Sequence, residues 1–293
     1  MEIGPLLALL AALSFAANLV SVRRGIILGG KSSTATAVSV FTGVLLFLFI
    51  LPITGDYKQL GSVSWQAIIL LATAGIINFC LSRYIFFSCV RLIGANRATA
   101  VGRTDIIFAA FFGVLFFAET ISLTLVLGSL GIMLGAILVN LVKEEGVYKF
   151  QTSGALLGVI SSLLAATTSL LVKSAMKEVG SPYAATFISY AAAAIVWVII
   201  LAVKEAQRVD MLKINRSALI MFILTGAFAL TGHLFRYSAL ARSPVSVIQP
   251  LMGTVVLFTF FLSFFINRKI DVFNWRVFTG VVMVIISIFL IFL

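Results

Sequence analysis

The sequence predicts an all-α integral membrane protein with ten transmembrane helices, arranged as two inverted five-helix repeats. Three observations support this fold class. Hydrophobic residues make up 61% of the 293 residues and the mean hydropathy is +1.18, which leaves too little polar surface for a water-soluble domain. Apolar runs of membrane-spanning length recur along the whole chain. The two halves also resemble each other at an offset of about 150 residues.

The apolar runs favour helices over β-strands. A helix needs about 20 apolar residues to cross a bilayer, whereas barrel strands are about 10 residues long and alternate apolar with polar side chains. The predicted spans are, in chain order, Ile3–Val22, Ser32–Gly55, Gln59–Ser82, Ala98–Ala118, Thr120–Val142, Phe150–Val172, Val179–Val203, Ser217–Leu240, Ser243–Asn267 and Val277–Leu293. The first is expected to be retained as a helix, because Met1-Glu2 lacks the basic start of a signal peptide.

The halves match in a shared register. The segment Gly4–Leu10 resembles Gly154–Ile160, and Thr104 corresponds to Thr254. We therefore predict one repeat over residues 1–146 and a second over 147–293. Five spans per repeat is an odd number, so the second repeat must enter the membrane from the opposite side. Inverted repeats place a binding site near the midplane of the bilayer, between the halves.

Corresponding motifs close the third helix of each half. Phe87-Ser-Cys-Val is followed by a turn at Gly94–Ala98, and Tyr237-Ser-Ala-Leu by a turn at Ser243–Val247; the fourth helices follow, with Pro250 early in the second. In this the chain resembles EamA-type ten-helix members of the drug/metabolite transporter superfamily. The resemblance implies a secondary carrier working by alternating access. It also implies a cavity inside the first four helices of each half, with the fifth helices packed on each other.

Two features depart from that pattern. The acidic Glu119 of the first half is replaced by Asn267-Arg268-Lys269 in the second, and the first-half fourth helix has Gly102-Arg-Thr-Asp105 and no proline. The distribution of Lys and Arg over the loops places both termini outside the cytoplasm, whereas the family resemblance implies cytoplasmic termini; both orientations stay open. We expect a multi-pass protein of the cell (inner or plasma) membrane.

Asp105 is the only acidic residue deep in a predicted span. Intramembrane charge usually marks a pathway or a site, so Asp105 is a candidate for substrate binding and proton coupling. A salt bridge with Arg83 or Arg103 is the alternative. From the predicted helix ends, Arg83 and Arg103 should both lie about 8 Å below one membrane face. They either snorkel to the headgroups or bind an anionic group of the substrate together.

The second half supplies its own candidates. His233 is the only histidine, corresponds to Arg83 in the repeat, and is a second candidate for proton coupling. Arg236 lies one helical turn further on, on a neighbouring part of the same face. Hydrogen-bonded packing is the alternative for His233.

Neutral residues complete the predicted substrate site. Asn18 and Thr168 are repeat partners at membrane depth, Tyr84 is an aromatic candidate for the cavity wall, and Gln249 precedes the helix-kinking Pro250. Gly131 and Gly135 have the spacing that permits close contact between two helices. We expect this contact to be with the tenth helix, and the alternative is a contact between two copies of the chain in a dimer.

The motifs of several other classes are missing from the sequence. There is no P-loop, dinucleotide fingerprint or metal-ligand spacing, so we expect no enzyme activity, no cofactor and no metal. The net charge of +11 comes from basic residues in the loops between spans. We therefore expect a small-molecule substrate and the lipid bilayer as partners, and no nucleic acid. The protein is expected to be a monomer or a homodimer. The leading hypothesis is a proton-coupled or facilitative exporter of a small polar metabolite such as an amino acid. An organic-phosphate or nucleotide-sugar exchanger and a channel or non-transporting scaffold are the alternatives.

Overall fold

The fold is described from a computed structural model. It describes residues 3–117, 123–140, 151–176, 178–240, 242, 251–268 and 273–290. Within these ranges the chain is helical and contains no strand. Six helical segments are long and apolar enough to cross a membrane, and two shorter apolar helices, Leu251–Ile266 and Trp275–Leu290, follow them. This confirms the all-α membrane fold.

The first half contains five spans. The first, second and fifth are single helices: α1 (Ile3–Ile27), α2 (Ser32–Thr54) and α7 (Leu123–Asn140). The third span consists of α3 (Trp65–Gly75), the π-helix η2 (Ile76–Ser82) and α4 (Arg83–Ile93). The fourth consists of α5 (Ala95–Gly102) and α6 (Thr104–Phe117). A short 3₁₀-helix, η1 (Asp56–Ser62), joins the second and third spans.

The second half repeats this order. Its spans are α8 (Thr152–Ala175), α9 (Pro182–Val203), α11 (Arg216–Leu240), α13 (Val255–Ile266) with the helical residues 251–253 before it, and α14 (Trp275–Leu290). The short helix α10 (Glu205–Leu212) stands where η1 stands in the first half. The ten predicted spans thus each correspond to helix, and the order repeats between the halves.

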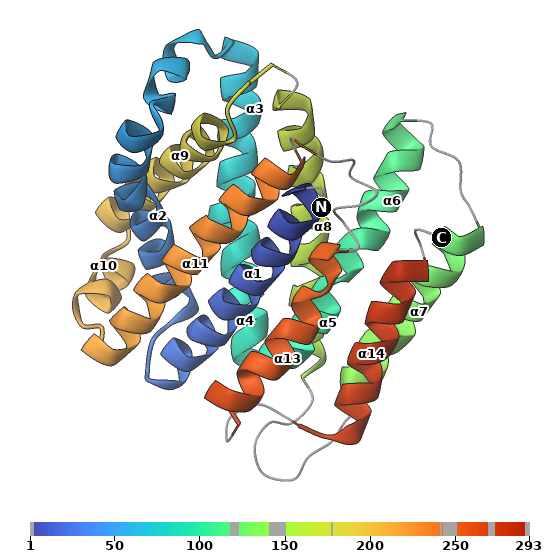
Figure 1. The fold of residues 1–293 in the computed structure, drawn as a ribbon. Coiled ribbons are helices and arrows are strands. Elements are labelled where there is room, and N and C mark those ends of the chain that lie inside the picture. Colours follow the sequence, from blue (N-terminus) through green and yellow to red (C-terminus); the bar gives the residue numbers. More distant parts are fainter. Residues whose placement is uncertain are drawn as a thin grey trace.

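The helices of the two halves are interleaved. Helix α1 packs on α11 and α13 of the second half, and α8 packs in the same way on α3, α4 and α6 of the first. Helix α2 packs on α11, and α9 on α3, while α7 and α14 form a separate pair at one side of the bundle (Figure 1). Each half therefore packs on the other through equivalent helices, as the inverted repeat predicts.

Glycines permit the closest of these crossings. A Cβ on Gly75 of α3 would meet the backbone of Ser189 in α9, with the Ser189 carbonyl carbon at 2.7 Å. A Cβ on Gly226 of α11 would meet the backbone of Ser39 in α2, with the carbonyl oxygen at 2.8 Å. Ser39 and Ser189 are repeat partners. In each half, therefore, a glycine allows the third span to pack closely against the equivalent serine in the second span of the other half.

The α7–α14 pair uses the predicted glycines. A Cβ on Gly131 would touch the Ser287 side chain, and one on Gly135 would lie 2.9 Å from the Gly280 carbonyl oxygen. This confirms the tenth helix as the packing partner of the fifth.

The fourth span of each half is broken at equivalent places. The Thr104 hydroxyl donates to the Val101 carbonyl at 2.9 Å, and the Thr254 hydroxyl donates to the Leu251 carbonyl at 2.6 Å. Regular α-helix is interrupted at Arg103, directly before Thr104, in the first half and at Thr254 itself in the second. The break in the first half, at Arg103, was not predicted, although the matched threonines were visible in the sequence.

Candidate functional site

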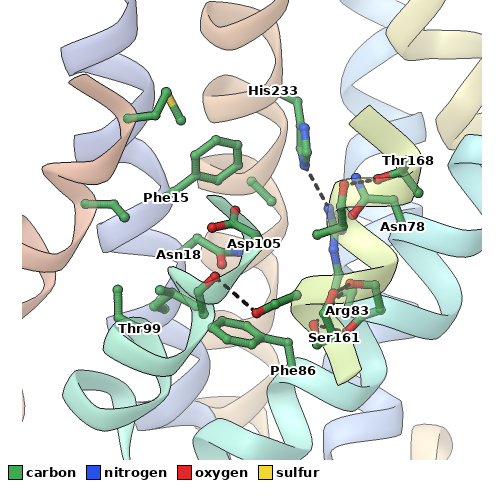
Figure 2. A pocket seen from close by; sticks show the side chains of 18 of the residues that line it. Phe15, Asn18, Asn78, Arg83, Phe86, Thr99, Asp105, Ser161, Thr168 and His233 are labelled. Atoms are coloured by element: carbon green, nitrogen blue, oxygen red, sulfur yellow. Dashed lines mark hydrogen bonds between the residues drawn. The ribbon is translucent and has the colours of Figure 1, made fainter. Parts of the chain in front are cut away.

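A cavity of about 180 Å³ is lined by both halves of the chain; we call it the central cavity. Its walls come from α1, η2, α4, α5, α6, α8, α11 and the beginning of the ninth span. Seven of the nine residues predicted for substrate binding line it: Asn18, Arg83, Arg103, Asp105, Thr168, His233 and Arg236. Figure 2 shows how several of them face the same space from different helices.

Arg83 is buried beside the cavity and is only 8% exposed. Its guanidinium donates to the Ser39 hydroxyl at 3.1 Å and to the Tyr190 hydroxyl at 3.2 Å. Its Cζ lies 4.7 Å from the centroid of the Phe79 ring. No carboxylate lies within 4.0 Å of it in the described part of the chain. Arg83 therefore does not snorkel to the headgroups, and its partners are all neutral.

The predicted distances of both arginines from the helix ends were wrong. The third span continues to Ile93 and the fourth begins at Ala95. At about 1.5 Å per residue, Arg83 then lies about 15 Å from the end of its helix and Arg103 about 12 Å from the beginning of the next. Both distances exceed the ~8 Å that was expected, because the third helix was expected to end about five residues after Arg83 and the fourth to begin about five residues before Arg103.

His233 contacts Arg83 across the two halves. Arg83 Nη2 lies 3.5 Å from His233 Nε2 (Figure 2). A guanidinium can only donate, so this contact is a hydrogen bond when Nε2 is unprotonated. The imidazole is 6% exposed and stands edge-on to Phe15 and Phe79, with ring centroids 4.9 Å away in both cases. Residues 83 and 233 are repeat partners, so their contact marks the axis that relates the halves.

Arg103 and Asp105 form the ion pair that was the predicted alternative for Asp105. Their side chains approach to 3.5 Å and are 18% and 26% exposed. The second carboxylate oxygen, Oδ1, is buried and has no hydrogen-bond partner in the described part of the chain. The pair sits at the break between α5 and α6, where the backbone of Arg103 closes α5 with a bond to the Ala100 carbonyl at 3.2 Å.

Arg236 faces the cavity from α11. Its Nη2 donates to the Ser169 hydroxyl of α8 at 2.9 Å, and none of the described carboxylates lies within 4.0 Å of it. The cavity wall thus carries three guanidiniums against one carboxylate. An anion entering this space would find two cations that no acidic side chain of the described residues neutralises.

The neutral candidates differ in what holds them. Asn18 donates its side-chain amide to the Thr225 carbonyl at 2.8 Å, which ties α1 to α11. The Thr168 hydroxyl donates to the Ala165 carbonyl of its own helix at 2.8 Å. Thr167, next to it, does not line the cavity.

Two predicted residues are not brought to the cavity. Tyr84 is 43% exposed and does not line it, because it follows Arg83 directly and one residue turns a helix by about 100°. Gln249 lies outside the described residues.

Several contributors were missed from the sequence. Ser39 and Tyr190 hold Arg83, and Ser82 of η2 lines the cavity. The Ser82 hydroxyl also meets Ser161 of α8, with 3.1 Å between the two oxygens. The π-helix that turns these residues toward the cavity has no sequence signature of its own. In the sequence, only the match of Ser39 with Ser189 at the repeat offset could have pointed to Ser39 as a residue of the site.

Metal-ligating residues do not gather in the part of the chain that the structure describes. No group of three or more His, Cys, Asp or Glu side chains is close enough there to hold a metal ion.

Comparisons with known proteins give the family. The model of the EamA-like transporter family matches the chain twice, over residues 2–141 and 152–293. No curated protein matches. Among solved structures 27 chains match, and one of them, described only as the crystal structure of a protein, has a TM-score of 0.68 over 97% of this chain and 95% of its own, at 12% identity. That identity shows a shared fold alone. The two family matches together span nearly the whole sequence, so the chain belongs to the EamA-like transporter family and is a multi-pass membrane transporter of the drug/metabolite type.

Proposed function

We propose that this transporter is a secondary active carrier that exports a small metabolite with an anionic group, with amino acids as the first candidates, across the plasma (inner) membrane. The observation that supports this most is Arg83. It is a buried guanidinium on the cavity wall whose partners Ser39, Tyr190 and His233 are all neutral. Buried charge is unfavourable unless it is paired, so a substrate carboxylate would supply the missing counter-charge.

The size of the cavity favours a small substrate. The volume of the central cavity is about 180 Å³. Pockets for drug-sized ligands are larger, at about 300–1,000 Å³. A nucleotide sugar would therefore need a much wider cavity than this conformation has, whereas an amino acid would not.

Alternating access is supported by the way the halves meet. Equivalent helices pack across the interface in both directions, so a rocking motion would exchange one set of contacts for its symmetric counterpart. The Arg83–His233 contact joins the halves near the axis of that motion. A ligand bound there would respond to the relative position of the two halves.

Two groups are candidates for proton coupling. A proton on His233 Nε2 would remove the acceptor for Arg83 and place two cations 3.5 Å apart. A proton on Asp105 would weaken its pair with Arg103. In either case the released guanidinium is freed to bind an anion, so protonation would change the affinity for the substrate.

Counterflow in proteoliposomes tests this function. Vesicles preloaded with an unlabelled amino acid should take up the labelled one, and an imposed proton gradient should change the rate. Arg83→Gln should abolish exchange. Arg242→Gln serves as a control because Arg242 is exposed and donates to the Ser238 carbonyl of the preceding helix, away from the cavity lining. Exchange by Arg83→Gln at the control rate would contradict the proposal.

A second candidate is an exchanger of small organic phosphates. The excess of guanidiniums over carboxylates on the wall favours it, because Arg binds phosphate bidentately. Neutralising Arg83 and Arg103 together should then abolish phosphate-dependent exchange. Unchanged exchange in the double variant would exclude it.

A further inference from the structure

We infer that the substrate carries two separate carboxylates, one bound by Arg83 and the other by Arg236. This inference rests on the proposed function and narrows its substrate class to small dicarboxylates, including acidic amino acids. It follows from the number of charges on the cavity wall and from how each charge is held.

The first binding position is at Arg83. Three neutral groups from three helices hold its guanidinium in place: the Ser39 hydroxyl from α2, the Tyr190 hydroxyl from α9 and the His233 imidazole from α11. The Phe79 ring covers one of its faces. The side chain is thus fixed before any ligand arrives, and no carboxylate of the described chain lies close enough to neutralise it.

The second binding position is at Arg236. It follows His233 by one turn of α11, and among the described residues its guanidinium bonds only the Ser169 hydroxyl of α8. Arg83 is held instead by groups of α2, α9 and α11. Because the two guanidiniums are bound by different sets of helices, we expect them to bind two separate anionic groups rather than one.

Asp105 does not neutralise either position. Its Oδ2 is already paired with Arg103 at 3.5 Å. Its Oδ1 is buried and has no hydrogen-bond partner among the described residues. The three guanidiniums and one carboxylate thus leave two positive charges for the ligand to balance, within a volume that suits a molecule of about the size of glutamate.

The experiment compares ligands that differ in one charge. Counterflow is measured in proteoliposomes for labelled glutamate, glutamine, succinate and glycerol phosphate. Glutamate and glutamine have nearly the same shape, so their ratio of uptake rates at low concentration reports the second carboxylate alone. We expect glutamate and succinate to exceed glutamine by at least about tenfold, since a charge-assisted Arg–carboxylate contact exceeds the ~1.4 kcal/mol that a factor of ten requires.

Variants assign the second carboxylate to Arg236. Arg236→Gln should bring the glutamate-to-glutamine ratio close to one, and Arg236→Lys should restore much of it. Arg242→Gln should keep the ratio of the unmodified protein. Melting temperatures in detergent separate a folding defect from a change in selectivity, and the ratio itself is insensitive to how much active protein each vesicle holds.

Each other outcome overturns the inference in a recognisable way. If glutamine exchanges as fast as glutamate, the carrier stands and the dicarboxylate assignment falls. If glycerol phosphate exchanges fastest, a single dianionic group is the ligand and two separate carboxylates are not required. If Arg236→Gln keeps the ratio, Arg236 is not the second position. If no solute exchanges, the proposed function fails together with the inference.

Discussion

Replacing Gly75 by alanine tests the packing of the two halves most sharply. Gly75 lies where α3 of the first half crosses α9 of the second. A Cβ there would meet the carbonyl oxygen of Ser189 first, with its carbonyl carbon and Cα both at 2.7 Å. All three are backbone atoms, so no side-chain rotation can relieve the contact. The helices themselves must separate.

The cost follows from that separation. Ordinary contacts of a Cβ lie at 3.4–4 Å, so α9 would have to move by about 0.7 Å or more. Overpacking of this kind costs about 1–3 kcal/mol, and the rigid neighbour argues for the upper end. For a chain of 293 residues about 3 kcal/mol corresponds to a fall in Tm of roughly 5 °C.

Thermal unfolding in detergent measures this effect. Gly61→Ala is the matched control, because nothing lies within 4 Å of a Cβ at Gly61, and its Tm should stay within about 1–2 °C of the original since such substitutions cost under ~0.5 kcal/mol. If Gly75→Ala and Gly61→Ala unfold at the same temperature, the close crossing of α3 and α9 is not present and the interleaved packing is wrong.

Three further predictions use the same proteins and assays. A double-mutant cycle with Arg103→Gln and Asp105→Asn should give a coupling of about 1 kcal/mol in unfolding, because the pair is only partly exposed; zero coupling would contradict the pair. Gly131→Leu should lower the Tm by several degrees by forcing α7 and α14 apart, and an unchanged Tm would contradict that contact. Tyr190→Phe should weaken glutamate uptake about tenfold by removing one partner of the charged Arg83, and unaltered uptake would show that this anchor is dispensable.

Hydropathy and the repeat predicted the fold because both depend on regular features of the sequence. A bilayer requires about 20 apolar residues per span, so the spans were visible as runs. The repeat offset identified residues 83 and 233 as equivalent. The offset could not show that the two residues touch. Two equivalent residues are related by the rotation that superimposes one half on the other, and the sequence does not say how far either residue lies from the axis of that rotation.

The details that were missed arise from tertiary contacts. The third span continues through Arg83 to Ile93, beyond the end that was expected, and Ser39, Tyr190 and Phe79 accommodate the charge inside it. The π-helix before Arg83 alters the rotation of the residues that follow, which a regular period cannot anticipate. The ion pair of Arg103 and Asp105 was foreseen as an alternative, because two opposite charges two residues apart at a helix start can meet.

The central claim is that the two halves enclose a cavity that water and substrate reach, and thiol labelling tests it most directly. In a background in which Cys80 and Cys89 are replaced by alanine, Thr168→Cys places a thiol in the cavity wall, and Thr167→Cys places one at the same depth of α8 outside the cavity. A membrane-impermeant thiol reagent should label Thr168→Cys and leave Thr167→Cys unlabelled, and glutamate should slow the reaction. Equal labelling of the two variants, or none of either from both sides of the membrane, would contradict a substrate cavity between the halves.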